Sequence, residues 1–152
     1  MTLPHLPRSD STTVVTIRTV LLGILLFGMT GILAELLLLE HTDGYWQIVP
    51  IVLLATGIIV AAAHAFNRQH SPTIRVLQGL MAVFVVSGAV GTILHFTGNI
   101  EFERELKPTL NGFALLREAA MGATPALAPG AMVQLGLIGL LMTFRHPALD
   151  RG

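Results

Sequence analysis

The chain has 152 residues, of which 53% are hydrophobic and only 12% are charged. An ordinary soluble domain carries about 25% charged residues, so this composition argues against a soluble globular protein. Nine basic residues balance nine acidic ones, so no charge excess points to a nucleic acid or another polyanion as a partner. The absence of cysteine excludes disulfides and thiolate metal sites.

The charged residues gather in short segments between long apolar stretches, which is the pattern of a chain that crosses a lipid bilayer. Crossing the hydrocarbon core takes about 20 mostly apolar residues. We therefore predict an all-α fold, an integral membrane four-helix bundle, with spans at residues 20–39, 48–66, 76–97 and 126–144. The bundle forms one domain, residues 20–144, between an N-terminal segment of residues 1–19 and a tail of residues 145–152.

The loop between the third and fourth spans, residues 98–125, is long enough to hold structure of its own. Between residues 109 and 121 apolar residues recur at helical spacing, with Arg117 and Glu118 among them. This pattern predicts a short amphipathic helix in the second outer loop, lying in the headgroup region or folded over the end of the bundle.

Basic residues are divided unequally between the two sides that these spans define. Three lie on the side of residues 40–46 and 98–125, beside six acidic residues, whereas the opposite side carries six: Arg8, Arg18, Arg68, Arg75, Arg145 and Arg151. Short positively charged segments resist translocation. We therefore expect a multi-pass protein of a bacterial plasma (inner) membrane with both termini in the cytoplasm.

The first and third spans share a spacing of two glycines followed by an ionisable residue. The two sets are Gly28, Gly31 and Glu35, and Gly88, Gly91 and His95. Positions spaced by three, four or seven residues lie near one face of a helix, and small residues let helices approach closely in lipid. We expect both faces to point into the bundle. The repeat fits either a duplicated helical hairpin or chance.

Four polar residues form the candidate ligand- or proton-binding set near the outer side: Glu35, His95, Gln134 and Asn99. The first three lie at similar depths, by the helical rise of 1.5 Å per residue. An ionisable residue within a membrane is a functional hypothesis by default. The competing interpretation is that these side chains only join helices through hydrogen bonds.

The candidate metal ligands are His41, His95, Glu101 and Glu103. In an extended segment, Glu101, Glu103 and Glu105 would share one side and offer oxygen ligands to a hard cation. Their spacing matches no EF-hand or zinc motif, and three glutamates in an outer loop more often form a solvated acidic face. No cofactor is indicated by any motif.

The sequence carries no phosphate-binding loop and no hydrolase motif, and little of it lies outside the spans, so we expect a non-enzymatic role. The first hypothesis is a structural or accessory subunit of a membrane assembly, or a homo-oligomer, with the bilayer and other membrane subunits as partners. The alternative is a transporter or ion-handling protein with an outer polar site around Glu35 and His95. A membrane redox or quinone-binding subunit is the second alternative.

Overall fold

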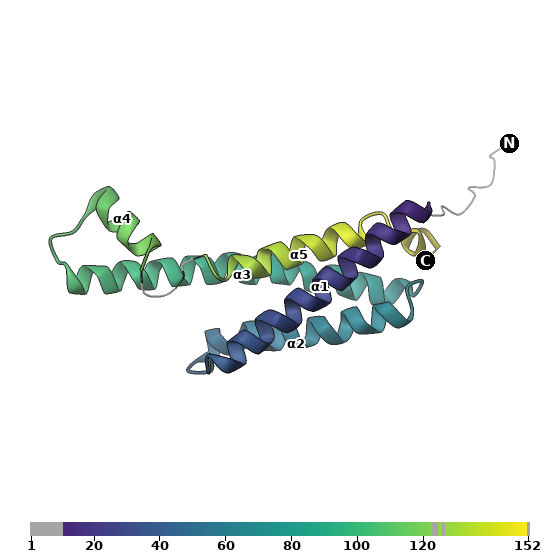
Figure 1. The fold of residues 1–152 in the computed structure, drawn as a ribbon, viewed down its shortest axis with the longest axis horizontal. Helices are drawn as coiled ribbons and strands as arrows, with labels where there is room; N and C mark the ends of the chain where they lie inside the picture. The colour runs from purple at the N-terminus through teal and green to yellow at the C-terminus, as the bar shows by residue number, and fades with distance from the viewer. Residues whose placement is uncertain (1–10, 123–124, 126, 152) are drawn as a thin grey trace. The chain divides into compact units, whose positions relative to one another are not determined.

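A computed structural model of the chain describes residues 11–122, 125 and 127–151 (Figure 1). The described residues form five α-helices and a short 3-10 helix, with no strand among them: α1 (Thr12–Leu38), α2 (Tyr45–Phe66), α3 (Ser71–Leu106), α4 (Gly112–Ala120), α5 (Gly130–Thr143) and η1 (Pro147–Arg151). The predicted all-α class is confirmed. Residues 1–10, 126 and 152, which belong to the predicted N-terminal segment, fourth span and tail, lie outside the described residues.

Three of the helices are long and apolar enough to cross a membrane. They are α1, α2 and α3, with 27, 22 and 36 residues respectively, and each contains the long, nearly charge-free stretch that a span requires. This is the composition of a multi-pass membrane protein, as the sequence predicts.

The fourth apolar helix, α5, is shorter than the predicted span of residues 126–144, because it has 14 residues and begins at Gly130. Residues just before it form turns rather than helix: Gly130 N–H donates to Leu127 O at 2.9 Å, and Met132 N–H donates to Pro129 O at 3.0 Å. Proline has no backbone N–H and fixes its own φ, which suits it to the start of a helix and not to its interior.

Two other helices extend past the predicted spans. α1 begins at Thr12 because Ser11 caps it, its hydroxyl accepting a hydrogen bond from Val14 N–H at 3.4 Å. α3 continues to Leu106, so residues 98–106 are helical and not part of a loop. The amphipathic helix expected within residues 109–121 is confirmed as α4.

The chain divides into two compact units. The first unit comprises residues 1–83 and 135–152, which include α1, α2, the first part of α3, most of α5 and η1. The second unit comprises residues 84–134, which include the rest of α3, α4 and the start of α5. Each unit is described by itself.

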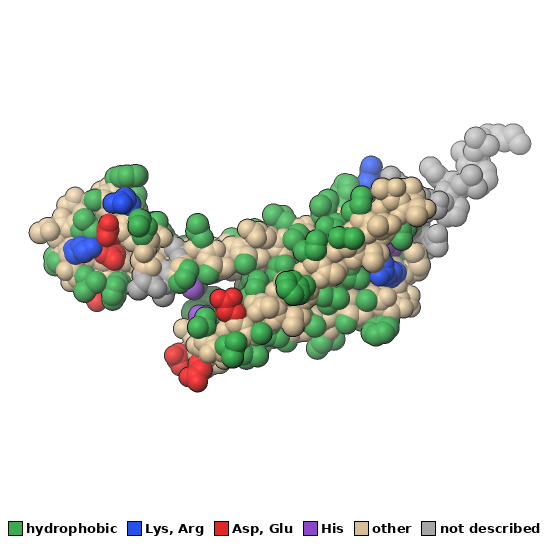
Figure 2. Space-filling model, viewed as in Figure 1, with side chains coloured by type: hydrophobic (Ala, Val, Ile, Leu, Met, Phe, Trp, Pro, Cys, Tyr) green, Lys and Arg blue, Asp and Glu red, His purple; other side chains and the backbone are tan. Residues whose placement is uncertain are grey.

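In the first unit α1 and α2 pack against each other (Figure 1). Its buried apolar side chains come from all four helices and include Leu25, Met29, Leu54, Leu77, Met81 and Met142. Two glycines admit neighbours closely, since a Cβ at Gly28 would lie 2.7 Å from Leu135 and one at Gly139 would overlap Met81. Hydrophobic side chains also cover the outside of α1 and α2, and acidic ones gather at the turn that joins them (Figure 2). This distribution suits a lipid surrounding.

In the second unit, the glycine face of α3 packs against the start of α5. A Cβ at Gly88 would lie 2.8 Å from Pro129 O and from Val133 N, and one at Gly91 would lie 2.9 Å from Pro129 Cβ. The inward orientation expected for these two glycines is confirmed. At its other end α3 carries α4, whose Leu115 and Ala119 are buried (Figure 1).

Candidate functional site

The four candidate ligand-binding residues belong to different units. Glu35 lies in the last turn of α1 in the first unit, and its side chain is exposed. His95, Asn99 and Gln134 lie in the second unit, where His95 is half-buried, Asn99 is buried and Gln134 is exposed. His95 and Asn99 are four residues apart on α3 and therefore share a face of that helix. The helices of the first unit do not enclose Glu35, contrary to the inward orientation expected from the sequence.

Asn99 fixes the position of α4 in the second unit. Its side-chain Nδ2 donates to the backbone carbonyl of Ala119, at the end of α4, over 2.9 Å, and the Asn99 side chain is only 3% exposed. Space around it is tight, because a Cβ at Gly122 would lie 2.8 Å from Asn99 Cγ. A buried amide that satisfies a helix-terminal carbonyl is a structural joint between helices, which was one of the two interpretations of this set.

Removing this amide should detach α4 from α3. In Asn99→Ala the Ala119 carbonyl loses its buried donor, and we expect a loss of about 1–3 kcal/mol in the stability of the second unit. Hydrogen exchange at the α4 amides measures the effect, and Glu101→Ala, at an exposed position on α3, is the matched control. Equal protection of α4 in the two variants would contradict this role.

A charged cluster joins the same two helices nearer to the end of α3. Lys107 Nζ donates to Glu118 Oε2 at 3.1 Å and forms an ion pair with Glu103 Oε2 at 3.3 Å. Hydrogen bonds from Lys107 to Glu118 and then to Glu103 raise the pKa of Lys107 above its usual 10.5. The raised pKa means that this pairing favours folding below about pH 10.5, as long as both glutamates are ionised, and that it is lost as the pH rises through the higher folded value.

The carboxylates expected to share one side of an extended segment lie instead on a helix. Successive positions on a helix turn by about 100°, so Glu101 and Glu105 lie near one face of α3 and Glu103 lies on the opposite face. Glu103 is buried next to Lys107, whereas Glu101 is exposed. His41, the remaining metal candidate, lies in the turn between α1 and α2 of the first unit. Among the described residues no three His, Asp or Glu side chains are grouped so as to hold a metal ion.

The opposite end of the first unit holds a polar network that the sequence analysis did not anticipate. Arg18 donates to the backbone carbonyls of Met142 and Phe144, the latter over 3.1 Å, and so caps the C-terminal end of α5. Gln78 Nε2 donates over 3.2 Å to the carbonyl of Thr143, the residue between Met142 and Phe144. Arg18 and Gln78 each stand among apolar residues in the sequence, and this is the signal by which the network could have been found.

Two histidines are buried at this end of the first unit. The rings of His64 and His146 meet edge to face with centroids 5.9 Å apart, and each side chain is at most 5% exposed. His146 Nδ1 accepts a hydrogen bond from Ala148 N–H at 3.2 Å, which requires that this nitrogen carries no proton. The pair fastens η1 to the end of α2.

Comparisons of the chain with protein-family models, with curated proteins and with solved structures found no match.

Proposed function

We propose that the chain is a small multi-pass protein of a bacterial inner membrane that serves as a structural or accessory subunit of a membrane assembly, or assembles with copies of itself. In this proposal α1, α2, α3 and α5 cross the membrane as a four-helix bundle, with both termini in the cytoplasm. The turns before α5 supply the remaining length that its 14 residues lack.

The charges on α1 support this placement in the membrane. Arg18 and Glu35 are its only charged residues and stand 17 positions apart, which corresponds to about 26 Å along the helix. The hydrocarbon core is about 30 Å thick, so both charges lie near its edges, where water lowers the cost of keeping them. The arginine marks the cytoplasmic edge and the glutamate the outer edge.

The observation that carries the proposal is an unfilled face on α1, which we call the α1 glycine face and define by Gly23, Phe27 and Gly31. A Cβ added at either glycine would meet no atom within 4 Å, and Phe27 between them is 83% exposed. These residues repeat every four positions and therefore form one stripe. In lipid, helices associate through close packing. The exposed Phe27 side chain, with a glycine one turn away on either side, therefore offers a surface on which a second helix can pack closely.

The test is native mass spectrometry of the protein extracted gently from its own membrane. We expect an oligomer or a complex with another subunit, and we expect Gly31→Leu to reduce that species at least fivefold, since a leucine fills the notch without touching the chain's own fold. Gly79→Leu is the control because it places the same side chain at an equally open position on α3. A wild-type protein that is wholly monomeric and carries no partner would overturn the proposal.

Within the described residues of each unit, no observation favours the transporter or quinone-binding hypotheses over this one. Glu35 is exposed on α1, and the Asn99 amide is engaged by α4.

A further inference from the structure

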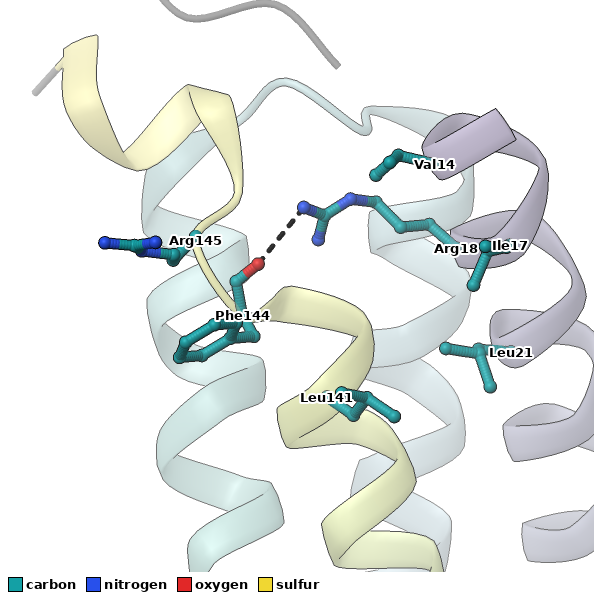
Figure 3. Close-up of a pocket in the computed structure, with 7 residues that line it drawn as sticks. All are labelled: Val14, Ile17, Arg18, Leu21, Leu141, Phe144 and Arg145. Atoms are coloured by element: carbon teal, nitrogen blue, oxygen red, sulfur yellow. Dashed lines mark hydrogen bonds between the residues drawn. The ribbon is translucent and has the colours of Figure 1, made fainter. Parts of the chain in front are cut away.

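An open groove of about 440 Å³ runs between α1 and the end of α5 in the first unit (Figure 3). Its volume falls within the range of small-molecule pockets, about 300–1,000 Å³. Five apolar residues and two arginines line it: Val14, Ile17 and Leu21 from α1, Leu141 from α5, Phe144 and Arg145 just after α5, and Arg18.

The polarity of the groove changes along its length. Leu21 and Leu141 lie about one helical turn deeper than the two arginines, on the side toward the middle of the helices (Figure 3). Ile17, Leu141 and Phe144 are each more than half exposed, so the walls offer apolar surface to a ligand. No Asp or Glu is among the lining residues. The groove therefore suits a molecule with an anionic head and an apolar chain.

Arg145 occupies a backbone conformation that disfavours arginine. Its φ is +50°, in the left-handed region that glycine or asparagine adopts at lower cost after the end of a helix. Its side chain is exposed and points out from the rim of the groove, with the guanidinium carbon 5.9 Å from the Phe144 ring centroid (Figure 3). Because an arginine is kept despite this strained backbone conformation, we infer that its positive charge has a functional role at this position.

The charged residues around the groove are also mostly positive. Arg68 and Arg75 lie at the same end of the first unit, where Arg68 donates to Thr19 of α1. Among the described residues of this end, at positions 11–19, 66–75 and 143–151, the single acidic residue is Asp150. A positive surface at a membrane boundary attracts anionic lipids at about 1 kcal/mol per basic residue, or about fivefold in affinity.

We propose that this groove binds one anionic phospholipid, with an acyl chain against the apolar walls and the headgroup at the end of the groove that carries Arg18 and Arg145. The site goes beyond the proposed assembly role and does not depend on the α1 glycine face. Its ligand class follows from the combination of an apolar groove, two arginines and a net positive end.

The test uses full-length protein in detergent, titrated with dioleoylphosphatidylglycerol or dioleoylphosphatidylcholine and followed by native mass spectrometry. The two lipids share their acyl chains, so any difference reports the charge of the headgroup. We expect the first phosphatidylglycerol to be retained about tenfold better. Arg145→Asn should lower that retention about fivefold and leave the melting temperature unchanged or higher, because asparagine suits the left-handed backbone. Arg117→Asn, at an exposed position on α4, is the control and should change nothing.

A second variant tests the acyl chain independently of charge. Leu141→Trp fills the groove while keeping both arginines, and it should reduce retention of phosphatidylglycerol about as much as Arg145→Asn does. Equal retention of the two lipids, or full retention in both variants, would overturn the proposal. So would displacement of the lipid by inorganic phosphate, or a dimer that forms only without lipid and covers the groove.

Discussion

Gly88→Ala should destabilise the protein by about 3 kcal/mol, the upper end of what overpacking costs. The added Cβ would lie 2.8 Å from three atoms, and two of them, Pro129 O and Val133 N, belong to the backbone. A flexible side chain can rotate away from such a contact, but a backbone atom moves only if the start of α5 separates from α3. The free energy of unfolding, from a dodecyl sulfate titration followed by far-UV circular dichroism, measures this loss.

Gly98→Ala is the matched control on the same helix and in the same unit. A Cβ at Gly98 meets nothing within 4 Å, and alanine is favoured over glycine in a helix by about 1 kcal/mol. We therefore expect this variant to be as stable as the wild type or more so. The opposite signs of the two changes test the packing of α3 on α5, and equal losses in both variants would show that this packing is wrong.

The apolar spans were predictable because lipid imposes them, whereas helix ends depend on local chemistry. α1 begins well before its apolar stretch because Ser11 supplies a cap, and α3 continues through polar residues until Leu106. The sequence contains a signal for the end of α3, because Pro108 disfavours helix at the residue before it. The alternating glutamates at 101, 103 and 105 nevertheless favoured the prediction of an extended segment.

The candidate site was predicted less well, for a physical reason. Depth along a helix follows from counting residues, but the partner of a side chain depends on how helices rotate and which segments meet. Asn99 was predicted as a candidate ligand-binding residue, and its side chain donates to the carbonyl of Ala119, a backbone group that leaves no mark in a sequence pattern. The sequence shows Arg18 only as a positive charge that helps to orient the chain. Its bonds to α5 could not be predicted, because the acceptors are again backbone carbonyls.

Arg18→Met should cost about 3 kcal/mol in the free energy of unfolding. The substitution keeps an apolar stem of similar length but removes the donors to the carbonyls of Met142 and Phe144 at the end of α5. The same dodecyl sulfate titration measures the loss, in zwitterionic detergent without added phospholipid. Arg75→Met, at an exposed position on α3, is the control and should stay within about 0.5 kcal/mol of wild type.

Two further readouts distinguish loss of the cap from a general loss of positive charge. Arg18→Lys keeps the charge but lacks the guanidinium fork that reaches two acceptors, so it should recover no more than about half of the lost stability. Hydrogen exchange should rise in Arg18→Met at the end of α5 and in η1, while α4 in the second unit should stay as protected as in the wild type. Full recovery by lysine would show that charge at this end of α1, and not the bonds to α5, supplies the stability.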